Sequence, residues 1–522
     1  MKIPTYLFAM LQFIAIATVA QNKPKPNVLF IAIDDLKPML GCYGESQVHS
    51  PNIDKLALSG TVFLSNYCQQ AVCAPTRASL LTGQRPDYTQ IWDLKTLIRD
   101  KVPTILTLPQ YFRQQGYTTS GIGKVFDSRS VDKNSDEPSW SIPYLKLEKD
   151  DFAKGFSKPF NNYYQSKELI QLINSFREEG VKKGLTGKEL EDFVANGHRP
   201  LYEAIDVPDN AYIDGANTLK AIQQIKKLKS EGNPFFMAVG LTKPHLPFVA
   251  PKKYWDLYER STLKLAEFQS LASGAPEFAF QASNELVNQY VLPSGERMPT
   301  GYSPKSDELQ RLLLHGYYAS VSYTDAQVGL ILAALKEQGL DKNTIIVLWG
   351  DHGWHLGDHS MWAKHSNFEQ ATKAPLIFSA PGFKGGQQVK SLSEFVDVFP
   401  TLTELAGLSI PSGLAGKSLV SAMKNPSVKI KDFAQSQYPR LNNQAMGYAI
   451  RTEQFRMVTW FKGEFHTTKI NSDNPVIGLE LYDYKKDPLE KENLALKAEY
   501  SSVLKQHQEI LTHLLKTQNQ SR

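Results

Sequence analysis

The 522-residue chain has only three cysteines, Cys42, Cys68 and Cys73. Three thiols cannot all pair within one chain, so a disulfide-rich scaffold is excluded and at least one thiol is free, reactive or modified. Cys42 and Cys68 either pair with each other or remain free and buried. Cys73 stands apart because of the residues that follow it.

The chain also lacks a strong charge bias, an internal repeat and a low-complexity segment. Its net charge of +5 is modest for this length and its basic residues are not clustered, so a nucleic-acid-binding protein is not expected. A basic groove for a smaller acidic ligand remains compatible with this charge. Hydrophobic residues make up 42% and charged residues 21%, as in globular proteins. At this length we expect one large domain and a smaller one.

A single long apolar run is present, Tyr6–Ala20, and it is shorter than a transmembrane helix requires. Lys2 precedes this run, and the small residues Thr18-Val19-Ala20 end it before a polar segment. This layout predicts a cleavable signal peptide over residues 1–20. No cysteine follows the run, which argues against a lipid-anchored form. We therefore expect export, to the periplasm or the medium, without a stable membrane anchor.

Charged and imidazole side chains follow four predicted parallel strands at the point where each strand ends. Asn27–Ile33 runs into Asp34-Asp35, Tyr117–Ile122 into Gly123-Lys124, Phe235–Leu241 into Thr242-Lys243-Pro244-His245, and Thr344–Trp349 into Gly350-Asp351-His352. Open α/β sheets bind ligands outside the carboxyl ends of their strands. These side chains are therefore predicted to form one site.

The expected fold is α/β, with a large mixed, mostly parallel sheet between helices over residues 21–431. The more polar stretch Asp127–Asn233 is interpreted as insertions over the sheet. Residues 432–522 form a second unit, a small antiparallel sheet with one covering helix. Its predicted strands are Met446–Arg451, Phe455–Phe461 and Leu479–Tyr484, and its predicted helix is Glu499–Lys516.

The segment Cys73-Ala74-Pro75-Thr76-Arg77 has the pattern C-x-P-x-R and precedes Leu81-Thr82-Gly83. Pro75 suits the first turn of a helix and Gly83 suits its end. Cys73 is thereby predicted at a helix N-terminus, where free amides favour an anion, with Arg77 one turn further on the same face. The alternative is a capped helix with a buried thiol.

These residues resemble the signature of the type I sulfatases, in which the cysteine becomes formylglycine. Thr76 stands where serine is usual. The chain resembles the iduronate-2-sulfatase branch in particular, and the alkaline phosphatase-like fold of the superfamily is implied. Matching stretches occur in order along the chain: Asp34-Asp35-Leu36, Gly41-Cys42-Tyr43-Gly44, Ser50-Pro51-Asn52-Ile53-Asp54, Gln69–Pro75, Gly123-Lys124-Val125-Phe126, Lys243-Pro244-His245, Asp351-His352-Gly353-Trp354, Trp362-Ala363-Lys364, Gln437–Arg440 and Met446-Gly447-Tyr448.

The resemblance implies metal ligands at Asp34, Asp35, Asp351, His352 and the modified Cys73. Three carboxylates form an oxygen-rich site that suits calcium far better than zinc, although the imidazole of His352 is unusual for calcium. The Asp34-Asp35 pair alone is also compatible with a helix cap. A formylglycine-generating or anaerobic maturation enzyme is an implied partner.

The chemistry of sulfate esters explains this set of residue types. The resemblance to the type I sulfatases implies that a hydroxyl of the hydrated formylglycine attacks sulfur and that the second hydroxyl later expels sulfate. Lys124, His245 and Lys364 match the positions that clamp the sulfate and protonate the leaving alcohol, with His245 the preferred general acid. The branch has histidine where this chain has Asp127. Asp127 either accepts a proton there or only begins the following loop.

Several further residues are substrate-binding candidates. Trp354, His355, His359 and Trp362 follow the Asp351-His352 pair closely and are predicted either at the pocket rim or in structural packing, and Arg440 is a candidate from the second unit.

The expected function is hydrolysis of sulfate esters on saccharides, such as algal ulvan or carrageenan fragments. The alternatives are glycosaminoglycan fragments as substrate, a phosphonate or phosphate ester hydrolase of the same fold, and a glycan-binding protein in which Cys73 is never converted.

Overall fold

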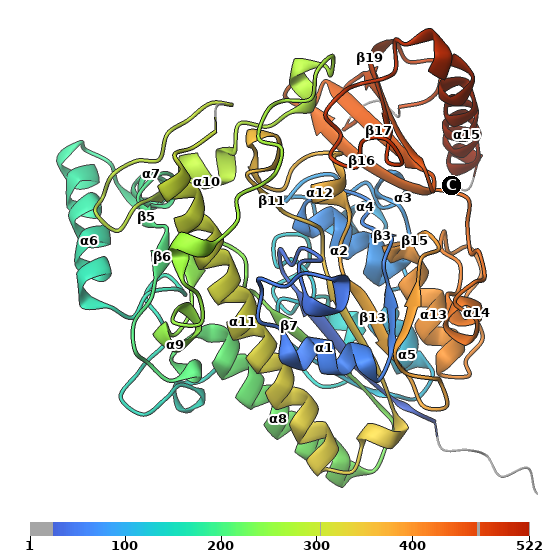
Figure 1. Cartoon of the computed structure of the whole chain (residues 1–522). Coiled ribbons are helices and arrows are strands. Elements are labelled where there is room, and N and C mark those ends of the chain that lie inside the picture. Colours follow the sequence, from blue (N-terminus) through green and yellow to red (C-terminus); the bar gives the residue numbers. More distant parts are fainter. Residues whose placement is uncertain (1–24, 303, 467–469, 521–522) are drawn as a thin grey trace, which may run out of the picture.

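The computed structural model describes residues 25–302, 304–466 and 470–520. Its centre is a seven-stranded sheet in the order β14-β2-β13-β10-β1-β7-β4 (Figure 1). The four predicted strands lie side by side and parallel: β10 (Thr344–Gly350), β1 (Asn27–Ile33), β7 (Phe235–Leu241) and β4 (Thr118–Gly123). Three of them, β1, β7 and β10, are buried along their whole length, as expected for parallel strands covered on both faces.

The other three strands of the sheet were not predicted from the sequence. β13 (Leu376–Ser379) runs antiparallel to β10, β2 (Thr61–Phe63) runs antiparallel to β13, and β14 (Gln387–Val389) runs parallel to β2. These strands have only three or four residues, too few to show a recognisable periodicity. The sheet is therefore mixed and mostly parallel, and the predicted fold class is confirmed.

The side chains of β1 alternate between two hydrophobic cores. Leu29, Ile31 and Ile33 pack with α1 (Pro51–Leu58), α8 (Ile213–Glu231) and α11 (Asp307–Glu337). The alternate residues of β1 pack with α2 (Cys73–Thr82), α5 (Leu108–Gln114) and α13 (Val398–Leu405). Figure 1 shows the long α11 crossing one face of the molecule, with the sheet behind it.

The interpretation of Asp127–Asn233 as insertions holds for only part of that stretch. α6 (Lys167–Lys182) and α7 (Gly187–Ala195) pack on each other at the side of the molecule, away from the sheet (Figure 1). α8, which lies in the same stretch, instead covers β7 and β4 and belongs to the helical layer. Its buried residues, such as Ile225 and Leu228, join the core under the sheet.

The C-terminal part contains a four-stranded antiparallel sheet, β16 (Ala434–Arg440), β17 (Ala445–Arg451), β18 (Phe455–Lys462) and β19 (Val476–Asp483), covered by α15 (Ser501–Gln520). This arrangement was predicted except for β16. Pro439 weakens the strand pattern there, and it is accommodated because β16 is the edge strand. The first strand begins just after the expected boundary at residue 432.

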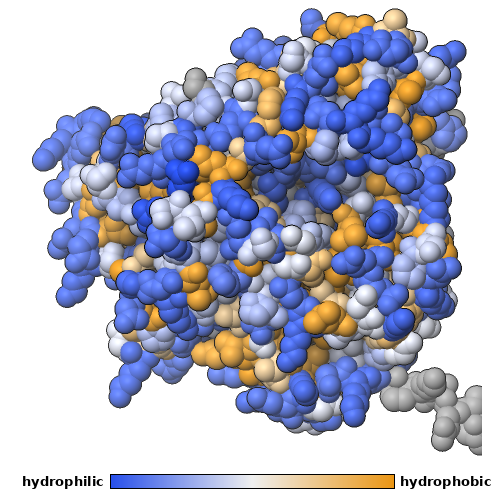
Figure 2. Space-filling model, viewed as in Figure 1, coloured by the Kyte–Doolittle hydropathy of each residue, from blue (hydrophilic) through white to orange (hydrophobic). Residues whose placement is uncertain are grey.

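The remaining short elements join these layers: β3 (Asn66–Tyr67), α3 (Pro86–Thr89), α4 (Ile98–Lys101), β5 (Arg199–Pro200), β6 (Tyr202–Glu203), β8 (Phe248–Val249), α9 (Lys252–Trp255), α10 (Asn284–Gln289), β9 (Tyr290–Val291), β11 (His355–Leu356), β12 (Trp362–Ala363), α12 (Glu369–Thr372), β15 (Ser393–Glu394) and α14 (Val420–Lys424). Hydrophilic side chains cover most of the face seen in Figure 2, with hydrophobic ones in small groups. Among the described residues, none of the helices combines the length and the hydropathy needed to cross a bilayer. The predicted signal peptide lies outside the described residues.

Candidate active site

The carboxyl ends of four neighbouring strands meet at one edge of the central sheet. Asp34 and Asp35 follow β1, Asp351 and His352 follow β10, Lys124 follows β4, and His245 lies in the loop after β7. Backbone hydrogen bonds continue past the strands: the amides of Asp34, Lys124 and Asp351 donate to carbonyls of neighbouring strands at 3.1 Å each. Backbone pairing thus fixes the Cα positions of Asp34, Lys124 and Asp351 at this edge of the sheet.

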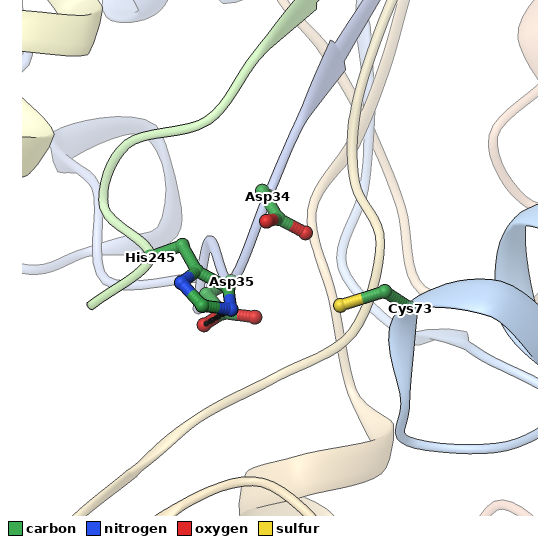
Figure 3. Close-up of side chains that lie close together, drawn as sticks. All are labelled: Asp34, Asp35, Cys73 and His245. Atoms are coloured by element: carbon green, nitrogen blue, oxygen red, sulfur yellow. Dashed lines mark ion pairs between the residues drawn. The ribbon is translucent and has the colours of Figure 1, made fainter. Parts of the chain in front are cut away.

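Cys73 lies beside the same strand ends but is carried by a helix, α2. It is the first residue of α2, which ends at Gly83 in a left-handed conformation with φ of 64°. Its Sγ points from the helix N-terminus toward Asp34, Asp35 and His245 (Figure 3) and lies 3.7 Å from His352 Nε2. The side chain is 2% exposed. Burial, with Asp34 adding to it, raises the pKa of the Cys73 thiol well above its usual range, so this thiol is poorly suited to act as a thiolate.

Arg77 connects the ends of three strands. Its Nε donates to Asp351 Oδ2 at 2.9 Å, its Nη2 donates to Asp34 Oδ1 at 3.2 Å, and its Nη1 donates to the carbonyl oxygens of Lys124 and Val125. Burial opposes the charge of this fully buried guanidinium, but Asp351 and Asp34 outweigh it and raise its pKa. Arg77 therefore holds the two carboxylates in place rather than facing a ligand alone.

Two lysines pair with the carboxylates that follow β1. Lys124 Nζ lies 2.6 Å from Asp34 Oδ2, and Lys364 Nζ lies 2.7 Å from Asp35 Oδ1. Burial raises the pKa of Asp34, but Lys124, His245 and Arg77 together lower it further and keep it well below its ordinary value. His245 Nε2 lies 3.8 Å from Asp35 Oδ2. The site thus alternates positive and negative groups in a buried setting.

The donor atoms at the centre fit a divalent metal ion. Ligand atoms of Asp34, Asp35, Cys73 and His245 all lie within 4.8 Å of one another, and so do those of Cys73, Asp351 and His352. Asp35 Oδ2 is buried without a hydrogen-bond partner among the described residues, which is costly unless a cation occupies that position. Several carboxylate oxygens around one point form a hard donor set.

A family model described as Sulfatase matches residues 26–408, and one described as N-sulphoglucosamine sulphohydrolase, C-terminal, matches residues 357–518. The human protein named Iduronate 2-sulfatase is 34% identical, over 90% of each chain. The chain belongs to the sulfatase family. The resemblance to the sulfatases noted in the sequence is confirmed, and so is the prediction that the chain is an enzyme, a sulfatase.

Further relatives of the sulfatase agree with this placement. A Formosa agariphila protein named Sulfatase is 32% identical, covering 85% of this chain and 81% of that protein. Two solved structures share the fold. One is BT4656, in complex with its substrate D-glucosamine-2-N,6-O-disulfate (21% identity, TM-score 0.69, 95% and 98% of the chains covered). The other is the phosphonate monoester hydrolase of Agrobacterium radiobacter (24% identity, TM-score 0.67, 94% and 96% covered).

The sulfatase site opens into a large cavity of about 1350 Å³. The predicted residues Asp34, Cys73, Lys124, Asp127, His245, Lys364 and Arg440 all line it. Arg440 stacks over Tyr438, with 4.6 Å between the guanidinium carbon and the ring centroid, and donates to main-chain carbonyls, including that of His365. It reaches the cavity from β16, and its role in substrate binding stays a prediction.

The four other substrate candidates do not line the cavity. Trp354 is 1% exposed and stacks on Tyr317, with ring centroids 6.2 Å apart. His355 Nε2 lies 2.9 Å from Ser366 Oγ, and His359 Nε2 lies 3.1 Å from the carbonyl of Glu490. Trp362 is 2% exposed in β12. Their proximity to Asp351 in the sequence reflects packing beneath the site, so the structural alternative describes these four residues and the pocket-rim prediction is corrected.

Glu285, on α10, is a site residue that the sequence did not reveal. Its carboxylate lies 3.2 Å from His245 Nε2, 3.4 Å from Lys364 Nζ and 3.8 Å from His365 Nε2. Burial raises the pKa of this carboxyl, but Lys364, His245 and His365 outweigh burial and lower it well below the ordinary value. α10 follows no strand and carries no recognisable motif, so no sequence signal marks it.

Asp127 points toward its own loop. Both oxygens accept from Arg129, at 2.8 Å from Nε and 2.8 Å from Nη2, and Oδ2 lies 3.7 Å from Lys124 Nζ. Burial raises its pKa, but these two cations outweigh burial and lower the pKa.

All three thiols, including Cys42 and Cys68, are free, so the pairing alternative for those two is excluded.

Proposed function

We propose that this sulfatase hydrolyses sulfate esters of saccharides, with Cys73 acting after conversion to formylglycine and with calcium held by Asp34, Asp35, Asp351 and His352. The observation that carries the proposal is the meeting of Cys73 with these four residues beside a large cavity, which Asp34 and Cys73 line. The unpartnered, buried Asp35 Oδ2 supports a bound cation, and the oxygen-rich donor set favours calcium over zinc.

The two implied groups have one task each. Formylglycine, once hydrated, supplies the hydroxyl that attacks sulfur and a second hydroxyl that later expels the sulfate. Calcium, when bound, neutralises charge on the sulfate oxygens.

The protein's own side chains do the remaining work. Lys124 and Lys364, whose ammonium groups lie against Asp34 and Asp35, are placed to bind sulfate oxygens and to stabilise charge as the S–O bond breaks. Arg77 fixes the carboxylates, so little rearrangement accompanies the reaction.

His245 is the proposed general acid. Its Nδ1 lies 2.6 Å from the carbonyl oxygen of Leu246 and donates to it, which leaves Nε2 facing the cavity beside Asp35 and Glu285. Nε2 lies at the cavity wall, 3.2 Å from Glu285 Oε1, where a leaving group that enters the cavity can take its proton. Transfer of this proton to the leaving sugar oxygen lets the alcohol depart without forming an alkoxide.

A saccharide substrate is supported by the size of the cavity and by the relatives. About 1350 Å³ exceeds the usual range for small-molecule pockets, which end near 1,000 Å³. The named relatives include an iduronate sulfatase, and BT4656 was solved with a sulfated glucosamine. Fragments of algal polysaccharides such as ulvan or carrageenan, and fragments of glycosaminoglycans, are the two substrate groups to compare.

A phosphonate or phosphate ester hydrolase is the second candidate, because the phosphonate monoester hydrolase of Agrobacterium radiobacter shares the fold. Parallel turnover of 4-nitrophenyl sulfate, 4-nitrophenyl phosphate and a phenyl phosphonate ester separates the two. Faster hydrolysis of the phosphonate than of any sulfate ester would favour the second candidate.

The decisive experiment has two parts. Mass spectrometry of the tryptic peptide Leu56–Arg77, from protein made in its native host, is expected to find formylglycine at Cys73. A screen of defined sulfated oligosaccharides is expected to release sulfate. An unmodified thiol in fully active enzyme would refute the proposed nucleophile. Export after cleavage of residues 1–20 is part of the proposal, and N-terminal sequencing of the mature protein tests it.

A further inference from the structure

The wall of the cavity carries more positive than negative side chains. Among the described residues that line it, there are nine lysines and arginines and four carboxylates. The carboxylates Asp34 and Glu285 pair with lysines of the reaction centre, and Asp214 accepts from the backbone amides of Thr242 and Lys243. The fourth, Asp127, is occupied by Arg129. The outer cations Lys133, Lys146 and Lys158 have no ion-pair partner within the described part of the chain.

Arg129 is held more firmly than any of these exposed lysines. Its guanidinium meets Asp127 through two parallel hydrogen bonds of 2.8 Å, and its own amide donates to Asp127 Oδ1 at 3.1 Å. The Ser130 amide and hydroxyl both bond the Asp127 carbonyl, so the loop is closed on itself. Asp127 is 1% exposed, whereas the side chain of Arg129 is half exposed and lines the cavity. No hydrogen bond occupies its Nη1 among the described residues.

The position of Arg129 relates it to the reaction centre. Asp127 Oδ2 lies 3.7 Å from Lys124 Nζ, and that ammonium lies 2.6 Å from Asp34 Oδ2. Three ion pairs in series, Arg129–Asp127, Asp127–Lys124 and Lys124–Asp34, thus connect Arg129 to the centre. At position 127 this chain has a buried carboxylate with the guanidinium of Arg129 docked on it. Arg129 thus places a positive charge on the cavity wall, further outward than Lys124.

We propose that Arg129 determines specificity by binding a second anionic group of the saccharide, a carboxylate or a second sulfate, and that Asp127 is a positioning residue for Arg129 and accepts no proton in the reaction. Oδ1 of Asp127 accepts from both Nε and the amide of Arg129, and Oδ2 accepts from Nη2 and faces Lys124 Nζ at 3.7 Å, so both oxygens are engaged by cations. A guanidinium with a fixed plane and a free Nη1 suits planar or multidentate oxygen acceptors. The inference rests on the proposed function, because it concerns a neighbour of the hydrolysed sulfate.

The test compares probes that carry one or two anionic groups. One pair is glucosamine 6-O-sulfate and D-glucosamine-2-N,6-O-disulfate. The other is a 2-O-sulfated uronate disaccharide and the same disaccharide with its carboxylate reduced to an alcohol. For Arg129→Ala, we expect kcat/KM on the preferred two-anion probe to fall about 10- to 100-fold through KM, as for loss of a charge-assisted hydrogen bond. The loss on the matched one-anion probe should be at least about tenfold smaller. A selective loss within the glucosamine pair identifies a second sulfate as the ligand of Arg129, and a selective loss within the uronate pair identifies a carboxylate.

Two further variants distinguish recognition from structure. Arg129→Lys should recover part of the KM for the two-anion probe, and Asp127→Asn should raise that KM with little change in kcat. Arg177→Ala is the matched control, because Arg177 forms the same two-pronged pair with Glu191 away from the cavity. Equal losses on both members of each pair in Arg129→Ala, or a collapse of kcat in Asp127→Asn with unchanged KM, would overturn the inference.

Binding of the same probes to Cys73→Ala, with and without Arg129→Ala, is measured by calorimetry. This arm requires no hydrolysis, so it separates failure of this inference from failure of the proposed reaction. Weaker binding of only the two-anion probe is expected. Equal affinities for the two members of a pair in the Cys73→Ala background would contradict a second anion site.

Discussion

The inner end and the outer wall of the cavity are built in different ways. At the inner end, Asp34 and Lys124 come from strand ends of the central sheet, lie mostly buried and compensate each other at 2.6 Å. At the outer wall, Lys133, Lys146 and Lys158 come from loops, are exposed and lack carboxylate partners in the described chain. We infer from this difference that the proposed chemistry takes place at the charge-balanced inner end, and that the unpaired lysines of the outer wall attract an acidic ligand.

Removal of the nucleophile should have the largest effect and bears on the inner end alone. Cys73→Ala is expected to lower kcat by more than about 10³-fold, because no other side chain takes over covalent catalysis. Calorimetry should still detect oligosaccharide binding through the outer wall. Cys42→Ala, which alters a free thiol away from the cavity, is the control. Retained turnover in Cys73→Ala would refute the mechanism.

Chelation of the metal should have the next largest effect. Dialysis against a chelator is expected to lower activity by at least about 10²-fold, because the sulfate oxygens lose their neutralising charge. It should also lower Tm, since an ion bound to the native state stabilises it. Calcium should restore both quantities and zinc should not. A chelated protein with unchanged activity and Tm would contradict a metal at the inner end.

His245→Ala should distinguish leaving groups. Sugar sulfates have poor leaving groups and depend on protonation, so a loss of about 10²-fold or more is expected for them. The loss for 4-nitrophenyl sulfate should be much smaller because its phenolate departs easily. His513→Ala, an exposed histidine on α15, controls for the substitution itself. Equal losses for both classes would argue against proton donation by His245.

Changes at the outer wall should be the smallest. Lys158→Ala is expected to raise KM for an acidic oligosaccharide about two- to fivefold with kcat unchanged, which is the range for exposed charge pairs. The difference from wild type should shrink as ionic strength rises. Lys188→Ala, an exposed lysine on α7 that does not line the cavity, serves as the control. A large kcat effect at Lys158 would remove the distinction between the two ends.

The same division explains what the sequence could predict. Asp34, Asp35, Asp351 and His352 follow buried parallel strands, whose apolar runs are easily recognised and whose ends must meet. Glu285 and Arg129 lie on a short helix and a loop, and only the tertiary fold brings them to the cavity. Trp354 and His359 show the opposite error, since nearness in sequence to Asp351 placed them at the rim whereas they pack below it.

The burial of Cys73 has a consequence for the order of events in the life of the chain. In the folded protein Cys73 is 2% exposed and lies at the N-terminus of α2, at the inner end of the cavity. A maturation enzyme that binds the segment around Cys73 would have to disrupt the packing of α2 on the sheet. We therefore expect the proposed conversion of Cys73 to formylglycine to take place before the chain folds, and a chain that folds first to stay inactive.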